Sequence, residues 1–394
     1  MKHSINYFFI IILVITACSP SKNVDVSSMI QDIQQANIPD KRLEYFNVDV
    51  ETQQGKNVLS GTTVSEKAYA DLQNLAEEKS LDFNVELLPA EKFKENPWAI
   101  VTLSVCNVRG AASHSAELVT QAVMGTPVKV YMENGGWFLI QTPDCYFGWV
   151  DAAGIALKTN AELAEWKALE KVLYKKQNGF AYAEADNDSE IEFDLVLTNL
   201  LSVVNEENGF YKIVLADGRK GFVDASECVS LDIWKKKRVT AEEVLATAFK
   251  FKGVPYLWGG TSAKMVDCSG FVKSGFYLHG LILQRDASQQ TFYGELVDTE
   301  KGYDILQPCD LVFFGKKATG NQKERVTHVG MVIDGSEFIH ASGKVRINSL
   351  NRNSEKYTAY YETAFVRARK VLGNVDGKGI EWVIDNEFYK EILP

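Results

Sequence analysis

A pattern that recurs after 73 residues constrains the middle of the chain more than any other feature. Residues 133–151 read ENGGWFLIQTPDCYFGWVD, and residues 207–224 read ENGFYKIVLADGRKGFVD. Both units place short runs of β-branched and aromatic residues between turns rich in glycine, asparagine and aspartate. Two units at this spacing indicate two small β-barrels, because a solenoid needs more copies to bury a continuous core.

The segments around these barrels have helical spacing. Residues 27–36 and 65–79 predict helices in a mixed N-terminal region, to which we assign no chemistry. The end of this region is a candidate to complete the first barrel. Residues 159–175 predict a helical connector between the two barrels.

From residue 239 the pattern changes to helices followed by strands. Thr240 and Glu243 have the spacing of a capping box, so a helix is expected to begin there. Another helix is expected over 268–279, and strands are expected over 310–314, 327–333, 337–341, 344–348 and 364–369. Helices followed by an antiparallel run of strands are typical of an α+β domain.

The first 18 residues are typical of an export signal. Lys2 and His3 precede an apolar run over 7–15 that is too short for a membrane-spanning helix. The run ends in Ile-Thr-Ala-Cys, which resembles the bacterial lipobox. We therefore expect lipidation of Cys18, a short tether over 19–26, and an exported protein anchored in the bacterial cell envelope, facing the periplasm or in the outer membrane. The alternative is an ordinary signal peptide with a coincidental cysteine.

The charge balance excludes one class of partner. The chain has 42 Lys and Arg against 52 Asp and Glu, a net charge of −10, and no block of basic residues longer than the four at 235–238. Nucleic-acid binding needs a longer block to neutralise phosphates, so we expect no nucleic-acid partner.

Five cysteines follow the signal, at 106, 145, 228, 268 and 309. Their dispersed spacing carries no zinc signature, and we expect neither a metal nor a cofactor. Because five is odd, at least one thiol has no partner within this set.

Cys268 stands apart from the other cysteines because of its neighbours. It follows Asp267 at the start of a predicted helix, where unpaired N–H groups and the helix dipole favour a thiolate. A cysteine nucleophile also needs a base, and that base needs an orienting group. His328 and His340, on neighbouring predicted strands, can supply both roles. Each residue alone is readily explained as structural, but the combination predicts a cysteine nucleophile.

Several motifs together resemble the NlpC/P60 cysteine peptidases, whose papain-like domain cleaves peptidoglycan stem peptides. They are Trp258-Gly259-Gly260, Asp267-Cys268-Ser269-Gly270, Asp310-Leu311-Val312-Phe313-Phe314, His328-Val329-Gly330 and His340-Ala341-Ser342. The two repeat units resemble bacterial SH3 (SH3b) domains. The whole chain is similar to the γ-D-glutamyl-L-diamino acid endopeptidases of the dipeptidyl-peptidase VI type.

This resemblance implies an α+β fold class, with a papain-like NlpC/P60 catalytic domain preceded by two small SH3b β-barrels. It divides the chain into a lipoprotein signal peptide (1–18), a tether and mixed region (19–98), a first SH3b domain (99–158), a helical connector (159–171), a second SH3b domain (172–234) and the peptidase domain (239–394).

The resemblance also implies roles for individual residues. Cys268 would attack the γ-D-glutamyl carbonyl, and His328 would act first as general base and then as acid. His340 would orient His328. The hydroxyl of Tyr256 would assist the oxyanion together with the backbone N–H of Cys268.

In the subgroup with SH3b domains, the first of these domains walls off the cleft, so substrates need a free N-terminal L-alanine. By resemblance, the substrate-binding residues are Asp267, Ser269, Tyr146, Trp258, Arg285, Asp286 and Ser288. Structural alternatives remain for five of the named residues. Tyr256 and Trp258 are candidate core aromatics, Tyr146 a solvent-facing loop residue, and Arg285 and Asp286 a local salt bridge.

Two positions depart from the family pattern. The glycine expected just before Asp310 is Cys309, so we expect a different turn there. Relatives often carry an acidic residue shortly after the first-barrel arginine, whereas residues 109–114 read RGAASH. One ligand of the substrate amine is therefore missing or comes from elsewhere in the chain.

Together these features predict a monomeric, lipid-anchored endopeptidase that acts on murein stem peptides in cell-wall recycling or turnover. It would cut L-Ala-γ-D-Glu from the diamino acid. One rival is an endopeptidase on intact cell wall. The other is a cell-wall-binding protein whose peptidase domain is weak or inactive.

Overall fold

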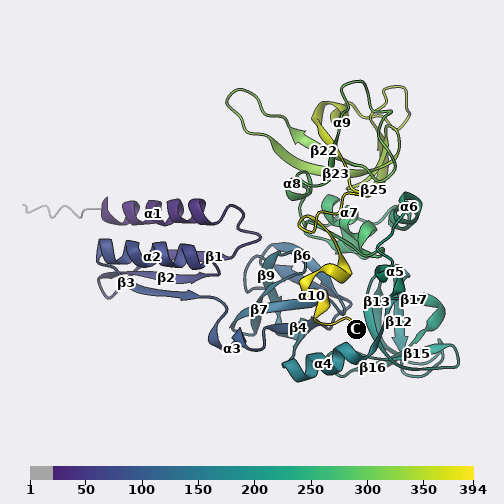
Figure 1. The fold of residues 1–394 in the computed structure, drawn as a ribbon, viewed down its shortest axis with the longest axis horizontal. Helices are drawn as coiled ribbons and strands as arrows, with labels where there is room; N and C mark the ends of the chain where they lie inside the picture. Colours follow the sequence, from purple (N-terminus) through teal and green to yellow (C-terminus); the bar gives the residue numbers. More distant parts are fainter. Residues whose placement is uncertain (1–20) are drawn as a thin grey trace, which may run out of the picture. The chain divides into compact units, whose positions relative to one another are not determined.

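The computed structural model describes residues 21–394, with side chains from Val26 onwards. The predicted signal and Cys18 therefore lie outside the described residues. The chain forms two compact units that divide between Leu88 and Pro89 (Figure 1). None of the described helices is both long and apolar enough to cross a membrane.

The N-terminal unit packs two helices against a three-stranded sheet. Its elements are α1 (Ser21–Asn37), β1 (Phe46–Gln53), β2 (Lys56–Thr63), α2 (Glu66–Lys79) and β3 (Asp82–Leu87). β1 and β2 form an antiparallel pair, and α2 carries the chain back so that β3 runs parallel to β2. The helix α2 begins where the Ser65 side chain accepts the N–H of Ala68, a common N-terminal cap.

The predicted helices over 27–36 and 65–79 are confirmed within α1 and α2. The predicted tether over 19–26 is wrong from Ser21 onwards, because α1 already begins there. The physical reason is that Val26 and Ile30, one turn apart, are buried together in the core of this unit. Residues up to Leu88 thus have their own core, and the segment that joins the first barrel is short and includes Phe93.

The two repeat units fold into seven-stranded sheets with the same strand order. The first, here called the first barrel, has the order β10-β4-β7-β8-β9-β5-β6, and the second barrel has β17-β11-β14-β15-β16-β12-β13. Each unit also ends in a 3₁₀ turn capped by an equivalent aspartate, Asp151 or Asp224. The strands are β4 (Trp98–Val101), β5 (Val105–Arg109), β6 (Leu118–Val123), β7 (Pro127–Asn134), β8 (Trp137–Gln141), β9 (Phe147–Asp151), β10 (Ile155–Leu157), β11 (Glu170–Tyr174), β12 (Asn178–Tyr182), β13 (Ile191–Val196), β14 (Leu200–Glu207), β15 (Phe210–Val214), β16 (Lys220–Asp224) and β17 (Cys228–Ser230).

The predicted helical connector is shorter than expected. Its helix, α4 (Asn160–Ala168), begins at a capping box between Thr159 and Glu162. The chain then enters β11, so the expectation of helix through residue 171 is wrong. Pairing with β14 and β17 buries β11 in the second barrel, and this tertiary pairing outweighs the local helical spacing.

The C-terminal part (residues 232–394) contains a six-stranded sheet with the order β21-β26-β22-β23-β24-β25. The helix α7 packs on one face of this sheet, and an aromatic cluster covers the other face. Its strands confirm the predicted ones, and the capping box at Thr240 is present. The elements are α5 (Asp232–Lys235), α6 (Ala241–Lys250), β18 (Thr261–Ser262), β19 (Met265–Val266), α7 (Cys268–Tyr277), β20 (Leu281–Leu283), α8 (Ala287–Gln290), β21 (Glu295–Val297), β22 (Leu311–Lys316), β23 (Arg325–Asp334), β24 (Glu337–Ser342), β25 (Lys344–Ser349), α9 (Ala359–Ala364), β26 (Phe365–Lys370), β27 (Ile380–Trp382) and α10 (Glu387–Lys390).

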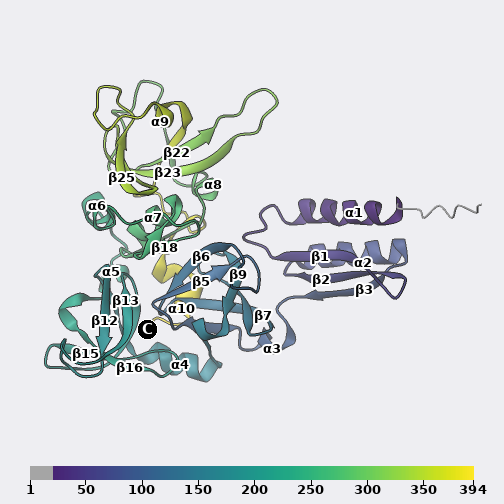
Figure 2. The same cartoon turned by 180° about the vertical axis from the view of Figure 1, so that it is seen from behind.

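The last residues of the chain join both barrels to the C-terminal part. β27 pairs with β20, and α10 then contacts β7 of the first barrel (Figures 1 and 2). The ring of Phe388 packs against Trp98, with centroids 5.4 Å apart. Tyr389 enters a buried cluster with Leu200 of the second barrel and Trp234 of α5.

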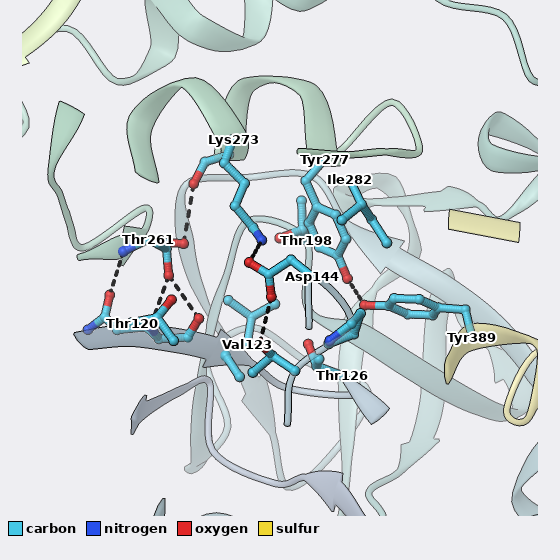
Figure 3. A pocket seen from close by; sticks show the side chains of 15 residues that line it. Thr120, Val123, Thr126, Asp144, Thr198, Thr261, Lys273, Tyr277, Ile282 and Tyr389 are labelled. Carbon is cyan, nitrogen blue, oxygen red and sulfur yellow. Dashed lines mark hydrogen bonds and ion pairs between the residues drawn. The ribbon is translucent and has the colours of Figure 1, made fainter. Parts of the chain in front are cut away.

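Polar and apolar residues at this junction line a cavity of about 60 Å³ (Figure 3). Lys273 of α7 forms a buried ion pair with Asp144 of the first barrel, and the hydroxyls of Tyr277 and Tyr389 contact each other. None of the residues predicted for the site lines this cavity, which lies between the two barrels and the C-terminal part.

Asn386 is the polar anchor of this C-terminal segment. Its Nδ2 donates to the carbonyl oxygen of Pro143 at 2.9 Å, and its Oδ1 accepts the N–H of Phe388. We predict that Asn386→Ala lowers the free energy of unfolding by about 1–3 kcal/mol, because the buried Pro143 carbonyl and the helix end lose their partners.

The matched control is Glu387→Ala, which removes an exposed ion pair with Lys129. We expect this control to cost less than about 1 kcal/mol. Denaturant-induced unfolding of both variants measures the difference, and equal effects of the two substitutions would contradict the assigned role of Asn386.

Candidate active site

Cys268 is the first residue of α7 and is 7% exposed. Burial raises the pKa of its thiol to about 12, and the charge of Asp267 acts in the same direction. Hydrogen bonds with the backbone of Val329 and Ser269 oppose this rise without overcoming it. Desolvation thus opposes the thiolate that the helix start favours.

Asp267 precedes Cys268 and is held by several donors. Its Oδ1 accepts the N–H of Gly270 at 2.7 Å, which caps α7, and its Oδ2 accepts the N–H of Gly259 at 3.1 Å. Arg285 reaches Oδ2 through Nη2 at 2.6 Å. These contacts are those of a helix cap and a buried ion pair, so Asp267 holds the start of α7, and with it Cys268, in place.

Arg285 is 1% exposed and links three parts of the site. Besides Asp267, its guanidinium donates to Ser269 Oγ at 3.2 Å and to Thr120 Oγ1 of the first barrel at 2.9 Å. Burial opposes the charge on Arg285, but the carboxylate of Asp267 outweighs it and raises the pKa of Arg285. The local salt bridge weighed for Arg285 is thus present, with Asp267 as its partner at 2.6 Å, whereas Asp286 lies at 3.9 Å.

The two predicted histidines are in direct contact. His328 lies on β23 and His340 on β24, and Nε2 of His328 is 2.7 Å from Nδ1 of His340. Gly330 lies between them along the sheet, where an added Cβ would come within 3.3 Å of the His340 Cβ and 2.6 Å of the Phe338 ring. The glycine in His328-Val329-Gly330 therefore makes room for the second histidine.

A third residue, Asn348 on β25, completes this chain of hydrogen bonds. Its Oδ1 is 2.9 Å from Nε2 of His340, while its Nδ2 donates to the Lys356 carbonyl oxygen at 3.0 Å. Asn348 is not among the residues predicted from the sequence. The signal that could have found it is the tight predicted hairpin of 337–341 and 344–348, which brings a polar strand residue close to His340.

These partners determine where the protons lie. The Lys356 carbonyl can only accept, so the amide of Asn348 must face it with Nδ2 and offer Oδ1 to His340. Nε2 of His340 therefore carries a proton, and its Nδ1 accepts from Nε2 of His328. Nδ1 of His328 is left with a free lone pair, which is what a general base requires.

The same environment keeps both rings neutral. Burial, followed by the charges of His340 and Arg346, lowers the pKa of His328 to about 3. Burial also lowers the pKa of His340 to about 4, although its hydrogen bond to Asn348 opposes this. The ring of Tyr361 covers both histidines, with centroids 6.0 Å from His328 and 4.9 Å from His340.

Tyr256 and Trp258 lie on the segment before α7. Tyr256 is half-buried against the core, and burial, then the charges of Cys268 and Asp267, raise the pKa of its hydroxyl. The hydroxyl thus stays a proton donor. Trp258 is 64% exposed, so the alternative of a core aromatic is wrong for it. Its Nε1 donates to Glu117 of the first barrel at 2.7 Å.

The first barrel meets the C-terminal part along β6. Backbone and side-chain groups of Gln121 and Thr261 exchange three hydrogen bonds. Gly259 has a φ of +81°, and an added Cβ would lie 2.2 Å from the Leu118 carbonyl oxygen. Only glycine fits this close approach, so Trp258-Gly259-Gly260 is also a contact motif with the first barrel.

Tyr146 is 6% exposed, and its hydroxyl donates to Asp286 Oδ2 at 3.2 Å. The alternative of a solvent-facing loop residue is therefore wrong for Tyr146. Asp286 precedes α8, and Ser288 lies half-buried within it. Ser269 is buried next to Cys268 and donates to Asp267. The structure thus brings the predicted residues around α7 and the face of the first barrel.

Comparison with known proteins agrees with this arrangement. Residues 253–369 match the model of the NlpC/P60 family, and residues 108–155 match the bacterial dipeptidyl-peptidase Sh3 domain. The chain is 30% identical to a γ-D-glutamyl-L-lysine dipeptidyl-peptidase of Bacillus subtilis over 56% of this chain and 71% of that protein. It is 28% identical to a protein of the same name from Bacillus cereus, over 66% of this chain and 77% of the relative.

The chain belongs to the NlpC/P60 family. It is a cysteine-type peptidase of the α+β class with SH3b domains before its catalytic part. A crystal structure of an NlpC/P60 family protein from Bacillus cereus shares the fold, with a TM-score of 0.57 and 23% identity over 69% of this chain and 99% of that one.

One departure from the NlpC/P60 pattern now has a structural account. Cys309 has a φ of +71°, in the left-handed region that favours glycine. The turn therefore keeps a glycine-like backbone with a cysteine in it, and the buried thiol donates to the Ala241 carbonyl oxygen. The expectation that Cys309 changes the turn is wrong in this respect.

Asn348 offers a direct test of the hydrogen-bonded chain in this NlpC/P60 peptidase. We predict that Asn348→Ala lowers kcat about ten- to a hundredfold with little change in KM, because His340 loses the acceptor that sets its tautomer. Steady-state kinetics on a cleavable stem peptide measures this. The exposed Asn353→Ala is the matched control and should behave as wild type. An unchanged kcat in Asn348→Ala would show that the histidine pair does not depend on this amide.

Proposed function

We propose that this protein is an endopeptidase that hydrolyses the γ-D-glutamyl-L-diamino acid bond of murein stem peptides with a free N-terminal L-alanine. The observations that carry the proposal are the chain from Asn348 through His340 to His328 and the hydrogen bond of the Cys268 thiol with the backbone of Val329, the residue after His328. The names of the two Bacillus dipeptidyl-peptidases support the same bond.

The reaction begins from a neutral pair, because the pKa of Cys268 is raised and that of His328 is lowered. The thiol sulfur attacks the γ-carbonyl carbon while its proton passes to Nδ1 of His328. The backbone N–H of Cys268 and the hydroxyl of Tyr256 donate to the oxyanion. His328 then gives its proton to the leaving amine as the C–N bond breaks, and water hydrolyses the thioester by the reverse roles.

The first barrel supplies the selectivity for a free amino terminus. Glu117 of this barrel accepts a hydrogen bond from Trp258, and Tyr146 of this barrel donates one to Asp286. A carboxylate therefore lies at each of these two contacts between the first barrel and the C-terminal part. A buried ammonium needs such acceptors. Glu117 provides the acid that residues 109–114 lack, and Arg109 holds its loop through the Ala116 carbonyl oxygen at 2.8 Å. Ser269, Ser288 and Trp258 remain substrate-binding proposals, and Asp267 and Arg285 act by positioning.

The proposed setting is the outside of the bacterial cell membrane. Other relatives include a protein of Escherichia coli named a murein DD-endopeptidase and one named a probable endopeptidase. Export and a lipid anchor at Cys18 would hold a monomeric enzyme where murein peptides are released, in recycling or turnover of the wall.

Cleavage of a defined peptide tests the proposal. We predict that the protein cuts L-Ala-γ-D-Glu-L-Lys after D-Glu, and that acetylation of the N-terminus lowers kcat/KM at least about a hundredfold, because the carboxylates of Glu117 and Asp286 lose their cationic partner. Mass spectrometry identifies the products, Cys268→Ala is the inactive control, and EDTA should leave the rate unchanged. Equal cleavage of the acetylated peptide would favour an enzyme on intact wall. No activity above Cys268→Ala would favour a binding protein.

The pH dependence tests the neutral pair. The ordinary pKa of histidine is about 6.5, and because the pKa of His328 is lowered, the base stays unprotonated at pH values below that. The ordinary pKa of a cysteine thiol is about 9, and because the pKa of Cys268 is raised, the thiol keeps its proton at pH values above that. We predict a broad bell-shaped profile of kcat/KM whose level region extends below about pH 6.5 and above about pH 9, because the pKa of His328 is lowered to about 3 and that of Cys268 is raised to about 12. Stopped assays over pH 4–11 (on the order of half-unit steps), with circular dichroism as a folding check, measure it. An acid limb centred above about pH 6.5 would contradict the neutral histidine pair.

A further inference from the structure

Arg346 is a charged residue beside the histidine pair that the proposed mechanism does not use. It lies on β25 directly opposite His340 on β24. Directly opposed residues of an antiparallel pair point to the same face of the sheet, so Arg346 shares the face of His340. Its Nη2 lies 3.5 Å from the hydroxyl of Tyr361, whose ring covers both histidines.

No carboxylate among residues 21–394 forms an ion pair with Arg346. The two acidic side chains on neighbouring segments are already taken, because Glu362 pairs with Arg352 and Glu337 pairs with Lys356. The Arg346 side chain is exposed, and its only hydrogen bond in this part of the chain is the long one to Tyr361. A cation is therefore held next to the base without a counter-ion.

This arrangement has a cost for catalysis unless an anion arrives with the substrate. His328 must become an imidazolium during the reaction, and the charge of Arg346 disfavours that form. A carboxylate bound to Arg346 would cancel this effect at the moment when the proton moves. The residue most favourably placed to bring one is the leaving residue, because its nitrogen must come within hydrogen-bond reach of His328.

We propose that Arg346 binds a carboxylate of the leaving diamino acid and so selects substrates whose third residue is anionic. This inference rests on the proposed function. The carboxylate has two sources of the same chemistry: the free α-carboxylate of a tripeptide, or the side-chain carboxylate of meso-diaminopimelate. Either would form a charge-assisted pair with the guanidinium.

Three peptides separate these sources. They are L-Ala-γ-D-Glu-L-Lys, its C-terminal carboxamide, and the carboxamide of L-Ala-γ-D-Glu-meso-diaminopimelate. We expect wild type to prefer the free acid over the lysine carboxamide about tenfold in kcat/KM. If the side-chain carboxylate of diaminopimelate can also bind Arg346, the kcat/KM of the diaminopimelate carboxamide should be close to that of the free acid. A diaminopimelate carboxamide cleaved as slowly as the lysine carboxamide would assign the contact to the α-carboxylate.

Variants then tie the preference to this residue. Arg346→Gln should reduce the ratio of acid to amide to about one and should cleave the lysine carboxamide at least as fast as wild type, because the uncompensated charge beside His328 is removed. Arg346→Lys should restore part of the ratio. Arg352→Gln, an exposed arginine nearby with its own partner, is the matched control and should keep the wild-type ratio.

Two results would overturn the inference. One is a wild-type enzyme that cleaves all three peptides equally fast. The other is an Arg346→Gln variant that slows both peptides by the same factor, since Arg346 would then act only on the histidine pair. Both differ from failure of the proposed function itself, in which wild type cleaves none of the three peptides faster than Cys268→Ala.

Discussion

Asp267 and Arg285 form a buried ion pair on which the rest of the site depends. A pair of charges taken out of water is stable only when further hydrogen bonds satisfy it. Here Asp267 also accepts the N–H groups of Gly270 and Gly259, and Arg285 also donates to Ser269 and Thr120. One pair thereby caps the helix that begins with Cys268, fixes the loop before it and joins the first barrel to the site.

A second set of contacts joins the two barrels to the C-terminal part. The C-terminal segment lies outside the part of the chain that matches the family model, yet Tyr389 shares a core with residues of both barrels. Asn386 and the ion pair of Asp144 with Lys273 add polar contacts between the first barrel and the C-terminal part. The selectivity proposed for the first barrel thus depends on residues distant from Cys268.

Local patterns predicted most of the secondary structure and failed where tertiary contacts compete. The capping box at Thr240 and the strands around His328 and His340 depend on near neighbours, and they were found. The helical spacing after Ala168 was misleading because β11 pairs with strands more than twenty residues away. The prediction of a tether up to Val26 failed because the Val26 side chain is buried in a core formed with residues later in the same unit.

The sequence by itself determined the candidate groups of this protein: a cysteine at the start of a helix, two histidines on adjacent strands, and a duplicated barrel. Motif and repeat are local, so they can be recognised without coordinates. Only the tertiary structure decided which partners these groups have. Burial sets the protonation of Cys268 and His328, Asn348 sets the tautomer of His340, and Glu117 reaches Trp258 across two domains. These depend on desolvation and on contacts between distant segments, which no short stretch of sequence encodes.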